Sequence, residues 1–335
     1  MNCLIKKEIN NHEQIHIPNK FFFQKSWIKI IEDTFKLKKL YIVFNQKNDS
    51  KILTLPFFRI NFFHKYEIIS MPYSFHIKLD DEKETLIYET FRRDRKLLKF
   101  KDVIVKSSFA SQDNFGNFKT RYFYYVVNLE NEYEKKISYN IKKAIKIKNI
   151  EYKFISDYNS KEFEDFFKNY LLNCKKLKTF FYPKNFFNNL FKNMNEKFFI
   201  LNSYQNNIFL GGVLILLDFI DLEGIYFISS KSKVGSNYSI DKILLLKSMT
   251  VCKNKKIKTF NLGKTNVTNK GLIFFKSQFG SEKKYLNYYS FRKKNYSILD
   301  QKNIFKKLIE ISIKLMPVFL YKIFNNILFK YLGKY

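Results

Sequence analysis

The sequence predicts an α/β (α+β) protein in which mixed, mostly antiparallel sheets are flanked by helices. Three observations predict this class. Strand-like runs alternate with helical periods along most of the chain, and three of these runs follow one another directly at 198–229. An apolar helical stretch at 239–252 then leads to a short buried strand at 259–262. Because turn residues separate the three consecutive runs, we expect them to form an antiparallel meander.

The first part of the chain contains the elements of one unit. Residues 21–36 have helical spacing, which places Trp27, Ile30 and Phe35 on one face. The further elements expected are strands at 40–44, 52–60 and 66–71, a charged helix at 80–99, and strands at 102–106 and 122–128. We therefore predict that the first part of the chain forms a mixed α/β unit, an earlier and degraded version of the unit in the second part of the chain.

The second part of the chain begins with a basic helix at 131–148, which bridges the two units. The further elements expected are a strand at 151–155, helices at 160–175 and 183–194, strands at 198–203, 208–218 and 224–229, a helix at 239–252, and strands at 259–262 and 286–291. Within the middle strand of the meander, Gly211 and Gly212 predict a bulge or a close backbone approach.

The C-terminal stretch at 304–335 has a different pattern. Apolar residues recur among lysines up to Leu315, and Pro317 then predicts a kink or a break in the helix. Its longest uncharged apolar run is far shorter than the roughly 20 residues that span a bilayer. Two alternatives follow: a pair of amphipathic helices at a membrane interface, or a C-terminal helix packed on the core of the protein.

The formal net charge of +31 at pH 7 has two explanations. So basic a surface suits anionic partners such as phosphate, tRNA or lipid head groups. The chain is also rich in Lys, Asn, Ile, Phe and Tyr, and its only alanines are Ala110 and Ala144. This composition is typical of an AT-rich coding bias, in which lysine occupies every solvated face. Both explanations stay open, and we expect no DNA as a partner.

The cysteines and histidines predict neither a disulfide framework nor a metal site. Cys3, Cys174 and Cys252 are odd in number and widely spaced, which favours a reducing compartment. His12 and His16 stand four residues apart without a carboxylate motif beside them. Residues 1–20 lack the apolar segment of a signal peptide. We therefore expect a cytoplasmic protein, which could be peripheral at the inner face of the cytoplasmic membrane.

Several short motifs follow one another along the chain in a distinctive order. They are FQKSW at 23–27, LPFFR at 55–59, SMPYS at 70–74, YNIKKA at 139–144, FNLG at 260–263 and GLIFFKSQF at 271–279. Together they resemble the FemAB-type and CelD-like branch of the GNAT acyltransferase superfamily, which includes relatives of the peptidoglycan-bridge aminoacyltransferases. The resemblance covers nearly the whole chain to about Phe291.

The resemblance implies two GNAT-like domains in tandem. We place an N-terminal GNAT-like domain at 1–135, a C-terminal acyltransferase domain at 136–298 and an amphipathic helical tail at 299–335. It also implies transfer of an acyl or aminoacyl group to an amine of a cell-envelope or polysaccharide precursor. The donor would be aminoacyl-tRNA or acyl-CoA, and no tightly bound cofactor is expected.

The resemblance assigns the central catalytic role to Lys276. Its ammonium would stabilise the oxyanion of a tetrahedral intermediate, the interaction that usually contributes most to acyl transfer. Phe275 would form a wall of the pocket. On a chain so rich in lysine, the alternative is a solvated Lys276 on a helix surface and a Phe275 that belongs to the core.

Five further residues are candidates for substrate binding. Arg59 and Lys142 carry a positive charge suited to phosphate, and Tyr73 can both stack on a sugar and form a hydrogen bond. Tyr226 falls on the strand that GNAT folds splay open for the donor, and Asn237 ends the loop that follows this strand. For each of these residues, an ordinary surface or core role is the alternative.

The segment SKSKVGSN at 230–237 departs from the family pattern. In GNAT enzymes that use coenzyme A, the splayed strand leads to a Q/R-x-x-G-x-G/A loop, whose amides hold the pyrophosphate at a helix N-terminus. Here Ser232 stands three residues before Gly235, and Asn237 stands two after it. The departure puts acyl-CoA in doubt as the donor. Ser138 and Lys142 also replace arginines that are frequent in the family, which is expected to alter acceptor binding.

The sequence therefore predicts an acyl- or aminoacyltransferase that acts by direct attack of an acceptor amine on a bound ester or thioester. No residue stands out as the general base. Two alternatives stay open. One is a CoA-dependent N-acyltransferase that modifies an amino sugar. The other is a non-catalytic GNAT-like scaffold that binds tRNA or an anionic membrane.

Overall fold

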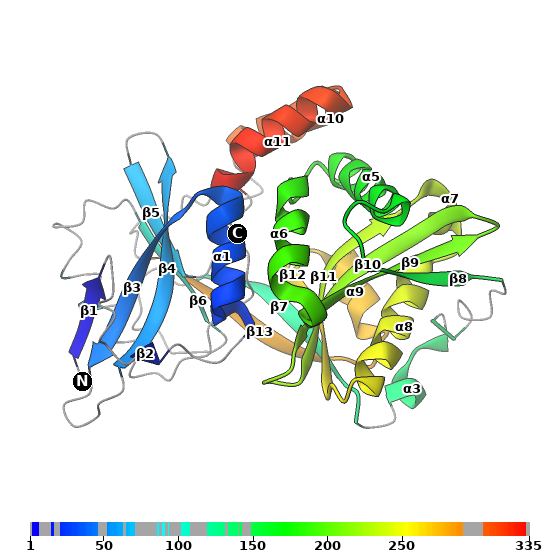
Figure 1. Cartoon of the computed structure of the whole chain (residues 1–335), viewed down its shortest axis with the longest axis horizontal. Helices are drawn as coiled ribbons and strands as arrows, with labels where there is room; N and C mark the ends of the chain where they lie inside the picture. The colour runs from blue at the N-terminus through cyan, green and yellow to red at the C-terminus, as the bar shows by residue number, and fades with distance from the viewer. Residues whose placement is uncertain are drawn as a thin grey trace. The chain divides into compact units, whose positions relative to one another are not determined.

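The computed structural model describes residues 2–6, 15–16, 21–45, 52–62, 65–70, 86, 89–90, 93, 102–107, 119–130, 133–139, 141–142, 149–290 and 304–332 (Figure 1). The chain divides into two compact units. Unit 1 consists of Met1–Tyr122, Tyr285–Asn303 and Leu328–Tyr335, and unit 2 consists of Phe123–Lys284 and Ile304–Ile327. Both units combine strands with helices, so the predicted mixed class is confirmed.

Unit 1 is built on a mostly antiparallel sheet. Its strands are β1 (Asn2–Lys6), β2 (Ile15–His16), β3 (Lys38–Asn45), β4 (Ile52–Phe62), β5 (Lys65–Ser70), β6 (Asp102–Ser107) and the end of β13 (Glu282–Ser290). The order is β1-β3-β4-β5-β6-β13, and β2 pairs with β4. Only the β5–β6 and β2–β4 pairs among these are parallel.

The first helix of unit 1 follows directly from its apolar spacing. A short turn, η1 (Phe21–Phe23), precedes α1 (Lys25–Phe35). Trp27, Ile30 and Ile31 are fully buried, and the Trp27 ring meets the Phe22 ring edge-on at 5.2 Å between centroids. The helix face predicted from the sequence is therefore confirmed.

Unit 2 contains the predicted meander. Its strands are β7 (Lys119–Asn128, from Phe123 onwards), β8 (Glu151–Ile155), β9 (Phe198–Gln205), β10 (Ile208–Asp218), β11 (Glu223–Lys231) and β12 (Thr259–Asn266). The order is β7-β12-β11-β10-β9-β8. Neighbours from β8 to β11 are antiparallel, and β11 and β12 are parallel.

Helices cover both faces of the unit 2 sheet (Figure 1). A Cβ on Gly211 would meet Ile240 of α8 (Ile240–Asn254), whereas a Cβ on Gly212 would meet Phe166 of α5 (Lys161–Lys176). Because successive residues of a strand point to opposite faces, α5 and α8 lie on opposite sides of β10. Both glycines allow the close approach that the sequence predicted.

The remaining elements of unit 2 are short or lie outside the sheet. They are α3 (Tyr133–Lys136), α6 (Lys184–Met194), η2 (Asn195–Lys197), α7 (Lys233–Asn237) and α9 (Lys270–Ser277). The predicted continuous helix at 131–148 is wrong in its described part, because the backbone leaves the helix at Ile137 and Ser138. The Ser138 amide donates instead to the Gln278 carbonyl, at 2.9 Å. A tertiary hydrogen bond therefore overrides the local helical propensity.

The C-terminal part consists of α10 (Ile304–Leu315) and α11 (Val318–Leu332), with Pro317 between them. Within unit 2 the two helices pack on the protein through Ile313, Tyr321 and Asn325, which are fully buried. The Asn325 side chain exchanges two hydrogen bonds with the Phe181 backbone, at 2.8 and 2.9 Å. Of the two predicted alternatives, packing on the protein is therefore present. Within the described ranges, no helix combines the length and apolar character needed to cross a membrane.

Candidate active site

Strands β11 and β12 lie side by side only at their starts. Glu223, Gly224 and Ile225 pair with Thr259, Phe260 and Asn261. Beyond these pairs β11 continues to Lys231 and β12 to Asn266, yet this fully described stretch contains no further pairing between them. The two parallel strands thus diverge toward their carboxyl ends. This is the splay that the resemblance to GNAT folds implied.

The FNLG motif forms a local turn at the point of divergence. The Asn261 side-chain oxygen accepts a hydrogen bond from the Gly263 amide at 2.9 Å, and the Asn261 amide group donates to Glu223 at 3.3 Å. Gly263 has φ of +77°, a conformation that glycine adopts without a steric penalty. The motif therefore makes β12 irregular directly after its last pair with β11.

Lys276, at the end of α9, reaches this irregular segment. Its Nζ donates to the Gly263 carbonyl at 2.7 Å and to the Lys264 carbonyl at 3.1 Å. The residue is only 3% exposed. The alternative prediction, a solvated Lys276 on the helix surface, is therefore wrong, because the side chain folds inward onto β12. Both of its hydrogen-bond partners are neutral, so the ammonium is hydrogen-bonded but its charge is not neutralised by them.

The electrostatic environment of Lys276 is unusual for a lysine. Burial, and in second place the charge of Lys264, lower its pKa to about 7. Burial also lowers the pKa of Lys264 to about 8. Desolvation and a like charge both disfavour the ammonium form. A negative charge that arrives or develops here would favour the ammonium form of Lys276, whose hydrogen-bond partners are neutral carbonyls.

Phe275 lies next to Lys276 but faces the core. Its half-buried ring meets the Phe279 ring edge-on at 5.4 Å and packs against the apolar cluster under α8. These contacts are those of a core side chain, and the role of Phe275 as a pocket wall stays a prediction.

Tyr226 is the first residue of β11 beyond the last pair with β12. Its ring is half-buried and packs against the same apolar cluster. Burial raises the pKa of its hydroxyl, so the group is protonated at neutral pH and can donate a hydrogen bond. The structure thus places Tyr226 on the diverging strand, as expected.

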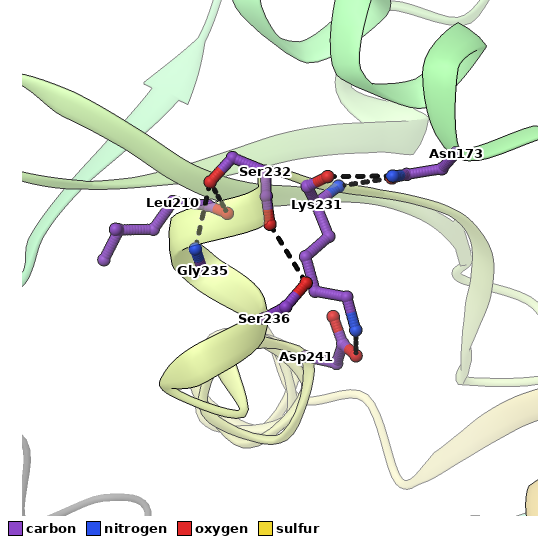
Figure 2. A network of polar contacts seen from close by, with 7 residues as sticks. All are labelled: Asn173, Leu210, Lys231, Ser232, Gly235, Ser236 and Asp241. Carbon is purple, nitrogen blue, oxygen red and sulfur yellow. Dashed lines mark hydrogen bonds and ion pairs between the residues drawn. The ribbon is translucent and has the colours of Figure 1, made fainter. Parts of the chain in front are cut away.

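The turn after β11 is held by a bulge in β10 (Figure 2). Leu210 lies at the register shift between β10 and β9, and its carbonyl accepts from both the Ser232 amide at 3.0 Å and the Ser232 hydroxyl at 3.1 Å. A Cβ on Gly235 would lie 1.9 Å from the same carbonyl oxygen. Gly235 is therefore required for the close approach of α7 to β10.

The polar groups of this turn have partners within the protein (Figure 2). The Ser232 hydroxyl caps α7 by accepting from the Gly235 amide at 3.0 Å. The Asn173 side chain binds the backbone N–H and C=O of Lys231, at 2.6 and 2.8 Å, and the Lys231 ammonium pairs with Asp241 at 2.5 Å. In the segment that would hold a pyrophosphate in CoA-dependent enzymes, side chains of the protein thus engage the Gly235 amide and the Lys231 backbone.

The other predicted binding residues are spread over the two units. Arg59 is half-buried on β4 of unit 1, opposite Lys38 and Ile68. Lys142 and Asn237 are exposed in unit 2. Tyr73 lies outside the described residues. Phe275 and Lys276 are neighbours in the chain, and the roles of all seven candidates stay predictions.

Three further residues of β12 and the end of α9 were not predicted: the half-buried Lys264 and the buried Thr265 and Gln278. Lys264 supplies one of the carbonyls and a second amine of lowered pKa. Thr265 and Gln278 are 1% and 7% exposed, and the Thr265 hydroxyl and the Gln278 side-chain carbonyl have no hydrogen-bond partner within the described structure. In the sequence, only the Gly-Lys pair at 263–264 could have pointed to these residues, and it does not stand out in a chain with 61 Lys and Arg residues. The described residues contain no group of three or more acidic, His or Cys side chains able to hold a metal.

Several solved structures have a similar fold. FemX superposes with a TM-score of 0.60 at 8% identity, over 93% of this chain and 100% of that chain. L-PGS from Bacillus licheniformis gives 0.50 at 14% identity, over 82% and 88%. A tandem GNAT protein from the clavulanic acid biosynthesis pathway gives 0.47 at 7% identity, over 77% and 84%. No protein-family model and no curated protein matches the sequence.

At such low identities the likeness concerns the fold alone. FemX is matched along its entire length, and the parallel strands β11 and β12 diverge as the motifs led us to expect. The resemblance drawn from the sequence is therefore confirmed at the level of architecture: this chain has a fold like that of FemX.

Proposed function

We propose that this protein transfers an acyl or aminoacyl group to an amine of a cell-envelope or polysaccharide precursor. One observation carries the proposal: a buried lysine, Lys276, is held by two backbone carbonyls where β11 and β12 diverge. The likeness of fold to FemX and the order of the sequence motifs support the reaction class. In this proposal Lys276 supplies the cation that stabilises the developing negative charge, the interaction on which acyl transfer usually depends most.

In the proposed mechanism the acceptor amine attacks the carbonyl carbon of the bound donor. A C–N bond forms while the carbonyl double bond opens, and Lys276 stabilises the oxyanion that results. The C–O or C–S bond to the donor then breaks. The leaving oxygen or sulfur takes up, through water or a substrate phosphate, the proton that the amine releases. Neither a covalent acyl-enzyme nor a metal is required for this sequence of bonds.

Burial makes Lys276 suited to this role. With water excluded, the attraction between an ammonium and an oxyanion is stronger than at the surface. Because its pKa is about 7, the unoccupied site holds a mixture of charged and neutral amine at neutral pH. Developing negative charge raises this pKa and restores the ammonium in the transition state, where its charge is needed.

We favour aminoacyl-tRNA as the donor. The Gly235 amide is occupied by the Ser232 hydroxyl, and the Ser232 amide by the Leu210 carbonyl, so two backbone donors of the loop are already engaged. The net charge of +31 suits a polyanionic donor. Acyl-CoA, with an amino sugar as acceptor, is the competing donor that the experiment must exclude.

The test is a reconstituted transfer assay with labelled aminoacyl-tRNA or acetyl-CoA and an amine-bearing envelope precursor. We expect transfer from aminoacyl-tRNA, and we expect Lys276→Met to reduce kcat by roughly 10²–10³-fold, as for loss of an oxyanion donor. Lys270→Met is the matched control, because Lys270 is exposed at the start of the same helix.

The outcomes separate the alternatives. Equal kcat values for Lys276→Met and the unmutated protein would remove Lys276 from the mechanism. Transfer from acetyl-CoA alone would establish the CoA-dependent alternative. Absence of transfer with every donor, together with thermal stabilisation by free tRNA, would favour a binding scaffold, because a ligand that binds only the folded state raises its Tm.

A further inference from the structure

Within unit 2, the helices α10 and α11 carry an exposed apolar surface. The large apolar side chains exposed on it, which we call the tail face, are Leu308, Ile311, Leu315, Val318, Phe319, Leu320, Ile323 and Ile327. Leu315 is 75% exposed and Phe319 is 63% exposed. Soluble proteins seldom expose so many neighbouring apolar side chains unless the surface has a partner.

The tail face lies opposite the side that packs on the protein. On α10, Leu308, Ile311 and Leu315 are spaced three and four residues apart, whereas the buried Ile313 lies two residues from each of the last two. At 100° per residue, two positions correspond to about 200° around the helix. Ile313 therefore points away from the apolar stripe.

The second helix repeats this division. The exposed stripe of α11 contains Phe319, Ile323 and Ile327. Its buried side contains Tyr321 and Asn325. The Tyr321 hydroxyl donates to the Thr179 carbonyl at 2.6 Å, and Asn325 is bonded twice to Phe181. The orientation of α11 is therefore fixed by polar bonds, and its apolar stripe is held outward.

Lysines flank the tail face. Lys307, Lys314 and Lys322 are exposed, and residues 304–332 contain a single acid, Glu310. The Lys175 ammonium, from the end of α5, adds a further positive charge at the Lys314 carbonyl, 3.2 Å away. An apolar stripe bordered by lysines is the pattern that binds an interface of apolar chains and anionic head groups.

We propose that the tail face binds the surface of an anionic lipid bilayer, with α10 and α11 lying in the plane of the interface. The 12 residues of α10 and 15 of α11 make helices of roughly 18 and 22 Å, which suits a flat orientation. A second copy of the chain is a poorer partner, because its own lysine border would repel this one. The surface thus brings unit 2 to a membrane.

The test is sedimentation of the full-length protein with vesicles of phosphatidylcholine containing phosphatidylglycerol, compared with phosphatidylcholine alone. We expect binding to the anionic vesicles, which added salt weakens without abolishing. Phe319→Glu/Ile323→Glu should weaken this binding by roughly a hundredfold or more, because two apolar side chains that would enter the bilayer are replaced by anions. Both positions are exposed, so the fold is expected to persist, and the Tm verifies this.

The matched control is Asn159→Glu/Asn254→Glu, which changes the net charge equally at exposed polar positions of unit 2 outside the tail. The control should bind vesicles nearly as the unmutated protein does. Equal binding by both double variants would overturn the proposal, since overall charge would then hold the protein on the vesicles. Absent vesicle binding, combined with a dimer that Phe319→Glu/Ile323→Glu dissociates in light scattering, would overturn it in favour of self-association.

Discussion

The two diverging strands of unit 2 end in surroundings of opposite character. After β12, Lys276 is buried with neutral carbonyls as its partners, and the Thr265 hydroxyl has no partner among the described residues. After β11, Ser232, Gly235 and Lys231 are all engaged by other groups of the protein. Unsatisfied buried polar groups reduce stability, and they are retained where a ligand or a reaction uses them. This difference supports our proposal that the chemistry belongs to the β12 side, whereas the β11 side gives structural support.

The largest expected effect concerns the structural side. Gly235→Ala places a Cβ 1.9 Å from the Leu210 carbonyl oxygen, and two backbone segments must separate to accommodate it. We expect the free energy of unfolding to fall by about 3 kcal/mol or more, measured by chemical denaturation.

Gly271→Ala is the matched control for this substitution. A Cβ at Gly271 would have its nearest neighbour at 3.8 Å, and alanine favours the first turn of α9. We expect no loss of stability there. A similar loss of stability in both variants would show that the turn after β11 is not specially constrained. The structural role that we give to this turn would then be wrong.

A smaller effect is expected on the chemical side. Thr265→Val removes a buried hydroxyl that has no partner within the described structure and keeps the shape of the side chain. Stability should change by less than about 1 kcal/mol, because no hydrogen bond within the protein is lost. We nevertheless expect the transfer rate to fall roughly tenfold, because in our proposal the β12 side of the diverging strands binds the substrate.

Thr259→Val, in the paired part of the same strand, is the control for Thr265→Val and should leave transfer unchanged. Equal transfer rates for the two variants would mean that the Thr265 hydroxyl has no role in the reaction. A marked loss of stability in Thr265→Val would mean that the hydroxyl is structural.

Most of the fold could be predicted because the local pattern and the tertiary packing agree. The meander and α8 have strong apolar periods and clear turns, and both are present at nearly the expected positions. The helix expected at 131–148 failed at Ser138, whose amide is taken by the Gln278 carbonyl 140 residues further along. Helix α7 was missed because it depends on a carbonyl freed by the bulge at Leu210. Such long-range bonds leave no local signal.

The candidate site could be predicted in position but not in character. The motifs pointed to Lys276, whereas its burial and the adjacent Lys264 became evident only from the fold. The composition concealed both features, because lysine is frequent throughout this chain.

The C-terminal stretch at 304–335 differs from the candidate site in this respect. Its amphipathic pattern allowed two alternatives, and the structure contains a packed side and an exposed apolar side on the same helices.

We propose that Lys276 is a buried amine with a lowered pKa at the reacting centre. The most direct measurement is an NMR titration of the protein with ¹³C-labelled lysine side chains, with Lys276→Met to assign the signal. We predict that this amine loses its charge as the pH rises through about 7, in contrast to the surface lysines. A Lys276 signal that titrates near the ordinary value of about 10.4 would contradict the account.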